Sequence, residues 1–311
     1  MKKKIAMLLM FVLLSCSIKT GCVEANDAEL MEPLTVFSPQ FPDAYILIEE
    51  NATPFSYHQT DMTICASVFV KETYLLDESG NITVESSELL SQEEVMAVGM
   101  ENFENNIVED AGTNETIIGS RSEDYQKLTI EIVVSEIFDA NFEGSYKVNG
   151  SASWSSGSSL FNLYGTPAGA DDFCSISWGG NYLVADYDAV GTPSYSVADT
   201  SSRIALADVD MNKGVVWRLD EYWTEFVGGH NRNIYLTNVD MEVLLQKKNL
   251  TGEGELTGVV MEYIHTYKEA EISPKITFGY DGENHMANVE IEISGYEKQW
   301  EIQCLVTGIE Y

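Results

Sequence analysis

Hydrophobic and polar residues alternate along many segments in the C-terminal two thirds of this chain. Leu128, Ile130 and Ile132 are separated by single polar residues, and the same period of two recurs in 289–293. Successive side chains of a β-strand point to opposite faces, so this pattern predicts strands with one buried and one solvated face. The other segments predicted to be strands are 65–75, 173–178, 183–187, 203–209, 215–227, 234–245, 259–268 and 300–306.

Short turn sequences separate these predicted strands. Segments 212–214, 249–252 and 281–282 each contain a Gly, which supplies the positive φ that hairpin turns need. Strands joined by such turns pair antiparallel, and the regular strand–helix alternation of a parallel sheet is missing. The pattern therefore predicts a mainly β fold, an antiparallel β-sandwich, with a β-barrel as the alternative.

One helix is predicted in the N-terminal part of the chain. Ser91 and Glu94 have the spacing of a capping box, and apolar residues within 95–103 form one helical face that Gly99 interrupts. We expect this helix to pack at the edge of a sheet, which makes the N-terminal region a small α+β unit.

Charge and composition divide the chain further. Segment 26–145 carries 25 acidic and 3 basic residues, whereas 146–311 carries 24 acidic and 10 basic residues. Because 105–124 is polar and rich in turn residues, we place a boundary there. The predicted regions are 1–25, 26–120 and 121–311, with one large domain plus an N-terminal extension as the alternative.

The first twenty-five residues have the layout of a secretory signal. Lys2, Lys3 and Lys4 precede the apolar run 5–14, and Ala25 offers a cleavage point after small side chains. A second interpretation is a bacterial lipobox, in which Cys16 is acylated and anchors the protein to a membrane. No later apolar segment reaches the roughly 20 residues that span a bilayer. We therefore expect a bacterial protein that is exported and then released, or lipid-anchored through Cys16.

A strong negative charge limits the partners. The formal net charge is -33, and removal of 1–25 makes it -36. Such a field repels nucleic-acid phosphates and anionic lipids, which excludes nucleic-acid binding and leaves cations and basic surfaces as compatible partners.

The cysteines predict at most one internal disulfide after export. Cleavage of the signal leaves Cys65, Cys174 and Cys304. Cys174 and Cys304 both occupy predicted strands and are the candidate pair, but three buried thiols that act as small hydrophobes are the favoured interpretation. Their spacing does not match a structural zinc motif.

Motifs of catalysis are missing from the sequence. The four histidines are His58, His230, His265 and His285, and no two of them have a metal-binding spacing. His265 alternates with Tyr residues in a predicted strand, which favours a hydrogen-bonded histidine in an aromatic layer over a catalytic base.

One segment has oxygen side chains at the spacing of calcium ligands. Asp208, Asp210 and Asn212 alternate as in calcium loops, and calcium is the alternative to our expectation of no cofactor. Lys213 stands where an EF-hand loop needs Gly, and Leu219 stands where it needs the bidentate Glu. This departure favours an ordinary β-turn in which Lys213 pairs with an aspartate.

Aromatic residues supply the second binding candidate. Trp178, Tyr182 and Tyr187 flank the pair Gly179-Gly180, and exposed flat rings of this kind stack on sugars. Trp217, Leu219 and Trp223 share parity within 215–227, which predicts that they face the core.

These observations favour a non-enzymatic binding or surface-interaction module whose partner is a glycan or a protein. Two alternatives stay open: a secreted glycosidase-like hydrolase with paired carboxylates, and a calcium-dependent carbohydrate-binding module. A hydrolase requires two acids in a concave cleft, and a sugar-binding module requires an exposed aromatic platform. A structural surface protein requires only an exposed strand edge or an apolar patch suited to self-association.

Overall fold

The computed structural model describes most of the chain after residue 43. The described residues are 36–37, 43–55, 59–76, 82–104, 121–137, 144–155, 171–195, 198, 200–220, 222–227, 229–248, 258–266, 274–281, 286–293 and 299–307. The predicted signal sequence 1–25, its cleavage point and Cys16 lie outside them.

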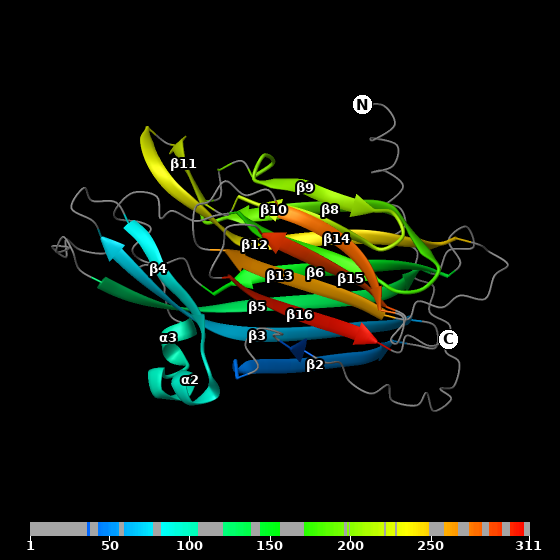
Figure 1. Ribbon diagram of the computed structural model, residues 1–311, viewed down its shortest axis with the longest axis horizontal. Helices are drawn as coiled ribbons and strands as arrows, with labels where there is room; N and C mark the ends of the chain where they lie inside the picture. Colours follow the sequence, from blue (N-terminus) through cyan, green and yellow to red (C-terminus); the bar gives the residue numbers. More distant parts are fainter. Residues whose placement is uncertain are drawn as a thin grey trace.

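The first of two large sheets has six strands and is antiparallel throughout. Its spatial order places β13 and β7 at the centre and β1 and β9 at the two edges. Figure 1 shows β16, β13, β10 and β9 following one another in this order. In that order the strands are β1 (Val36–Phe37), β16 (Gln299–Thr307), β13 (Gly258–Thr266), β7 (Asp172–Trp178), β10 (Gly214–Leu219) and β9 (Ile204–Asp210).

The second large sheet has eight strands, which also pair antiparallel. β8 pairs with β12 beyond the main path of the sheet, and β4 pairs with β3. The strands of the main path are β11 (Tyr222–Val227), β12 (His230–Lys247), β6 (Ser145–Trp154), β5 (Arg121–Ile137), β3 (Gln59–Leu76) and β2 (Ile46–Phe55), and the two others are β8 (Tyr182–Pro193) and β4 (Ile82–Leu89).

The main core lies between these two sheets. The described faces that meet there carry buried apolar side chains from both, such as Ile64 and Ile130 on one side and Ile302 on the other. At Gly150 a β-carbon would come within 3.1 Å of both Ile176 Cδ1 and Met261 Sδ, so the sheets approach closely there. The structure therefore confirms an antiparallel β-sandwich, and neither sheet closes into a barrel in the described strands.

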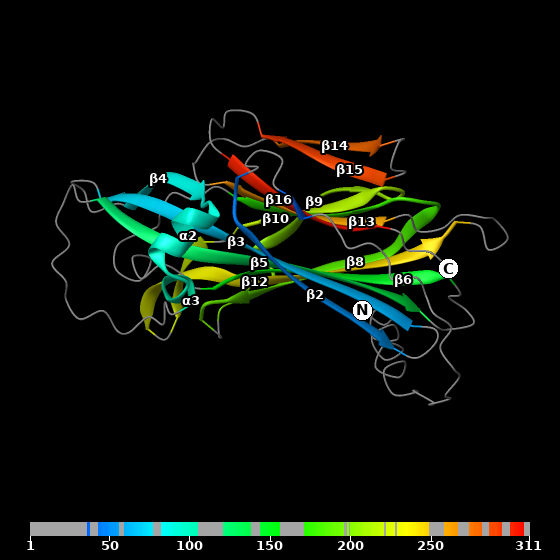
Figure 2. The same cartoon turned by 90° about the horizontal axis from the view of Figure 1, so that it is seen from below.

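A two-stranded hairpin covers the outer face of the six-stranded sheet. β14 (Pro274–Asp281) and β15 (Met286–Ile293) pair with each other and lie over this sheet (Figure 2). Every residue of β7 is buried, which requires cover on both of its faces. The core supplies one cover, and the hairpin contributes to the other.

The predicted capping box is present at the N-terminus of α2 (Gln92–Val98). The Glu94 amide donates to Ser91 Oγ at 3.5 Å, and the Ser91 amide donates to Glu94 Oε2 at 2.8 Å. The helix ends at Gly99, whose φ is 90°, and the short α3 (Glu101–Glu104) follows.

The position of these helices differs from the prediction of a sheet edge. Val95 and Phe103 pack on Phe69 of β3 and Tyr125 of β5. Phe69 alternates along β3 with Val68 and Val70 of the main core, so the helices pack on the outer face of the eight-stranded sheet.

The segment 215–227, predicted as one strand, forms two strands in different sheets. β10 ends at Leu219 in the six-stranded sheet, and β11 begins at Tyr222 in the eight-stranded sheet. Between them, the Asp220 amide donates to the Arg203 carbonyl at 2.7 Å, and Arg203 Nη1 lies 2.5 Å from Asp220 Oδ2. Trp217, Leu219 and Trp223 are all buried, as their parity predicted.

The boundary predicted at residue 120 falls directly before β5. β5 pairs with β3 from Arg121 to Val134, so strands from both sides of that boundary belong to one sheet.

Candidate functional site

A histidine held between two buried carboxylates is the chemically most unusual feature of the described structure. His265 lies on β13, where its Nδ1 is 2.9 Å from Oδ2 of Asp172 and its Nε2 is 3.1 Å from Oε1 of Glu72. The side chains of His265, Glu72 and Asp172 are 6%, 6% and 0% exposed. Because Glu72 belongs to β3 and Asp172 to β7, this cluster connects the two sheets through the core.

Further donors surround the two carboxylates. The Tyr263 hydroxyl donates to Oδ2 of Asp172, and the Thr266 amide donates to its Oδ1 at 2.8 Å. On the opposite sheet, Gln126 Nε2 donates to Glu72 Oε2 at 3.0 Å and to Asp124 Oδ2 at 3.2 Å. The burial of these charges is thus matched by hydrogen bonds, as the low polarity of a protein core requires.

Two tryptophan side chains pack against the ring of His265. Its ring centroid lies 4.9 Å from that of Trp300 and 5.5 Å from that of Trp154. Trp154 donates from Nε1 to the Tyr263 hydroxyl at 3.1 Å, and Trp300 donates from Nε1 to Ser87 Oγ at 2.9 Å. Both of these bonds also join strands of opposite sheets. The expectation of a hydrogen-bonded histidine in an aromatic layer is therefore confirmed.

His265, Glu72 and Asp172 hold the two sheets together, and we call these three residues the His265 clamp. An ionised carboxylate only accepts hydrogen bonds, so His265 satisfies two of them when both ring nitrogens carry a proton. If any one member is lost, a buried charge or polar atom remains without its partner. The free-energy cost of that unpaired group is larger than the free energy that the pair contributes to stability. The cluster thus joins β3, β7 and β13 in one arrangement.

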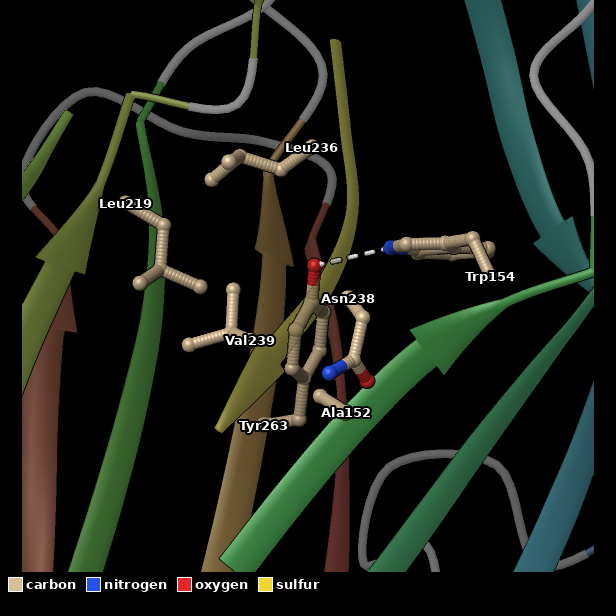
Figure 3. A pocket seen from close by; sticks show the side chains of 7 residues that line it. All are labelled: Ala152, Trp154, Leu219, Leu236, Asn238, Val239 and Tyr263. Atoms are coloured by element: carbon tan, nitrogen blue, oxygen red, sulfur yellow. Dashed lines mark hydrogen bonds between the residues drawn. The ribbon is translucent and has the colours of Figure 1, made fainter. Parts of the chain in front are cut away.

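A small pocket lies next to this cluster, at the hydroxyl end of Tyr263. Leu219, Leu236 and Val239 form its apolar wall, and the amide of Asn238 and the indole of Trp154 form its polar side (Figure 3). Ala152 and Tyr263 complete the lining. Its volume of about 10 Å³ is that of about one water molecule, so it does not accommodate a sugar ring.

Two of the three residues of the candidate aromatic platform are not available to solvent. Trp178 is 1% exposed and Tyr182 is 0% exposed, and Trp178 Nε1 donates to the Tyr182 carbonyl at 3.5 Å. Tyr187 is half-buried and packs against the same core. The first two rings therefore present no face to a sugar, because they are part of the packing between the sheets.

Two of the candidate calcium residues, Asp208 and Asp210, lie at the end of β9, and Asn212 lies in the turn between β9 and β10. Asp210 Oδ1 accepts from the Asn212 amide at 2.9 Å, and Lys213 Nζ lies 3.7 Å from Asp210 Oδ2, as the turn interpretation predicted. Asp208 Oδ1 accepts from the Val209 amide at 2.8 Å. Among the described residues, no group of three or more His, Cys, Asp or Glu side chains is arranged to hold a metal ion.

The candidate disulfide between Cys174 and Cys304 is not formed in the structure. β13 lies between their strands, with Tyr263 beside Cys174 and Met261 beside Cys304. Two strand spacings amount to about 9.5 Å, whereas a disulfide requires Cα atoms within about 7 Å. Both side chains are fully buried, and burial raises the pKa of Cys304 to about 12.

Sequence reasoning found His265 but missed its two carboxylates. Glu72 and Asp172 lie 193 and 93 residues from His265 along the chain, so no local spacing connects them. The one available signal was that Glu72 follows Ala66, Val68 and Val70 at alternate positions, so it occupies the apolar face of the predicted strand 65–75.

Comparison with known proteins gives little likeness. No protein-family model and no curated protein matches the chain. Among solved structures it resembles the Corynebacterium diphtheriae major pilin SpaA, described as pointing to a modular pilus assembly with stabilizing isopeptide bonds. That match has 8% identity, covers 78% of this chain and 79% of the pilin, and has a TM-score of 0.19, which is too low to assign a fold or a function. Within the described residues, no helix is long and apolar enough to cross a membrane.

Proposed function

We propose that this chain is an exported, non-enzymatic surface-interaction module whose copies associate along one edge of the sandwich. The observation that carries the proposal is a concentration of exposed apolar side chains on β8, on β9 and on the turn after β9. Four of the seven large apolar side chains exposed in the described residues lie there. They are Leu183 (36%), Val190 (58%), Leu206 (46%) and Met211 (48%).

β8 and β9 also have unpaired strand edges. In the described part of the chain, β9 pairs only with β10, and β8 pairs only with β12. The two strands approach each other, and the Val184 amide donates to the Met211 carbonyl at 3.0 Å. An unpaired edge offers backbone N–H and C=O groups to a further strand, and apolar side chains beside it add buried area.

A second copy of the chain fits this edge. Antiparallel pairing of β9 with its own copy about Ala207 would place Asp208 opposite Leu206 and Asp210 opposite Ile204. No carboxylate would then face another carboxylate across the pair, which matters for a chain with a net charge of -33. The His265 clamp supports the same role, because it keeps the two sheets in one arrangement while the edge strand β9 pairs with a second copy.

Self-association should depend on salt. Copies of a strongly acidic chain repel one another at low ionic strength, and the Debye length falls from roughly 20 Å at about 20 mM salt to about 4 Å at 500 mM. Sedimentation velocity of the chain from residue 26 onward is the direct test. We expect a monomer at low salt and a dimer or larger species at high salt.

Two variants locate the surface. Leu206→Asp on β9 places a carboxylate opposite Asp208 of the second copy, so it should keep the chain monomeric at both salt concentrations. Ile48→Asp on the opposite edge strand β2 is the matched control, because Ile48 is 43% exposed and Leu206 is 46% exposed. A monomeric wild type at all salt concentrations, or a loss of association in Ile48→Asp alone, would contradict the proposal.

A further inference from the structure

The β14–β15 hairpin is held on the six-stranded sheet mainly by a small apolar contact. Phe278 and Val289 pack over Phe173, Val216 and Ile264, which form a cluster separate from the main core. No described strand outside the hairpin pairs with β14 or β15. A two-stranded hairpin is marginally stable alone, so its position depends on this contact.

Two further contacts hold β14 above the turn that follows β9. Lys213 Nζ donates to the Phe278 carbonyl at 2.8 Å. A β-carbon at Gly214 would lie 3.0 Å from Phe278 Cε1, so this glycine lets the ring lie on the backbone of β10. Both contacts lie at one end of the sheet, close to Phe278.

Glu262 is buried on the same outer face, two positions before Ile264 on β13. It is 4% exposed, and its carboxylate accepts from Gln303 Nε2 at 2.8 Å and from Ser175 Oγ at 3.3 Å. Both partners are neutral. Desolvation raises the pKa of Glu262 to about 8, and nearby Glu301 contributes to the increase, while the bonds from Gln303 and Ser175 oppose it.

The charged groups around Glu262 do not compensate its ionisation. On β16, burial raises the pKa of Glu301, and Glu290 of β15 raises it further. On β10, Arg218 Nε lies 3.3 Å from Asp171 Oδ2, which belongs to the residue before β7. Lys213, at the turn, is directed to the Phe278 carbonyl and to Asp210.

We propose that the β14–β15 hairpin is a pH-sensitive strap, closed on the six-stranded sheet while Glu262 is protonated and released when Glu262 ionises. An ionised carboxylate gains hydration once water reaches it, and displacement of the hairpin admits water at a lower cost than opening of either large sheet. Release also exposes Phe173, Val216 and Ile264, an apolar strip that the closed hairpin covers.

The direction of the pH effect follows from linkage. The closed state binds the Glu262 proton more tightly than an open, hydrated state, in which the carboxyl has an ordinary pKa near 4.5. The closed state is therefore favoured most below that value and progressively less as the pH rises to about 8. The opening equilibrium should increase by up to about tenfold per pH unit in this window and level off above it.

Native-state hydrogen exchange of the backbone amides in 274–281 and 286–293 tests the strap. After correction for intrinsic exchange, we expect the opening equilibrium of the wild-type hairpin to increase by more than about tenfold between pH 5.5 and pH 8.5. Amides of β5 should keep their protection at both pH values. Equal loss of protection in β5 and in the hairpin would indicate global unfolding and overturn the proposal.

Substitutions assign the effect to Glu262. Glu262→Gln, which removes the charge at nearly constant volume, should keep the hairpin protected at both pH values. Asp240→Asn, at an exposed acid on β12, is the control and should respond as the wild type does. An unchanged pH response in Glu262→Gln would refute the strap.

A third variant keeps Glu262 and so stays informative if Glu262→Gln does not fold. Lys213→Met removes the hydrogen bond to Phe278. It should increase opening at every pH value without moving the pH window. A hairpin that is equally protected in Lys213→Met and in the wild type would show that this anchor does not hold the strap, and would count against the proposal.

Discussion

Two sites in this protein bury carboxyl groups, and they offset the cost of that burial in different ways. Glu72 and Asp172 share His265, Gln126 and the Thr266 amide donate to their remaining oxygens, and Tyr263 donates to the Asp172 oxygen that also lies against His265. Glu262 has only neutral partners, so burial raises its pKa. A buried carboxylate thus either shares a histidine with a second carboxylate or keeps its proton, and the two sites have different consequences for stability.

The His265 cluster predicts a large and specific loss of stability on substitution. His265→Leu leaves Glu72 and Asp172 buried without their shared partner, and it should lower the free energy of unfolding by about 3–5 kcal/mol. Urea unfolding at neutral pH measures this change. His230→Leu is the matched control, because His230 is exposed, and it should change stability by less than about 0.5 kcal/mol. Similar effects of the two substitutions would contradict the clamp.

The sequence could place His265 in an aromatic layer but could not identify its carboxylate partners, for a physical reason. The period of two in 259–268 placed His265 among aromatic neighbours, because strand geometry is local. The identity of its carboxylate partners depends on which strands lie side by side and face to face, and Glu72 comes from the opposite sheet. For the same reason the burial of Trp178 and Tyr182 escaped prediction, since a Gly-Gly pair indicates a turn but not what covers the rings beside it.

At the scale of elements, the alternation of apolar and polar residues predicted the strands well, but it did not show which sheet each strand joins. Segments 173–178 and 300–306 match β7 and β16 within one residue at each end. Segment 215–227 divides between two sheets, yet Trp217, Leu219 and Trp223 all remain buried. Because β10 and β11 both face the same core, the alternation of apolar and polar residues continues from one strand to the other. The sequence pattern therefore does not show that 215–227 divides into two strands. The outer-face position of the helices likewise depends on Phe69 and Tyr125, which belong to other elements.

The capping box of α2 gives a prediction for one element. Ser91→Ala removes the side chain that accepts from the Glu94 amide, and it should lower the stability of the protein by about 0.5–2 kcal/mol. Exchange of the amides within 93–98 should increase more than that of β3. Gln92→Ala, at the exposed first position of the helix, is the control and should be nearly neutral. Equal exchange in both variants would show that the cap does not hold the helix on the sheet.

At the scale of the whole molecule, charge opposes compactness. The chain has 50 acidic and 17 basic residues, so its carboxylates outnumber the cations available to pair with them. The repulsion is long-range and screened by salt, whereas the core contacts and the His265 clamp are buried and little affected by it. Stability and self-association should therefore both increase with ionic strength, although through different contacts.

Thermal unfolding in different salts separates this general screening from a specific calcium site. We expect the unfolding temperature to rise by a few degrees with NaCl and to rise no further when Ca²⁺ replaces part of it at fixed ionic strength. The reason is local, because Asp210 Oδ1 already accepts from the Asn212 amide and its Oδ2 lies near Lys213. The variant with Asp208, Asp210 and Asn212 all changed to Ala should respond to both salts as the wild type does. A rise specific to Ca²⁺ that this variant loses would instead establish a calcium site at the turn, since a ligand that binds the native state must stabilise it.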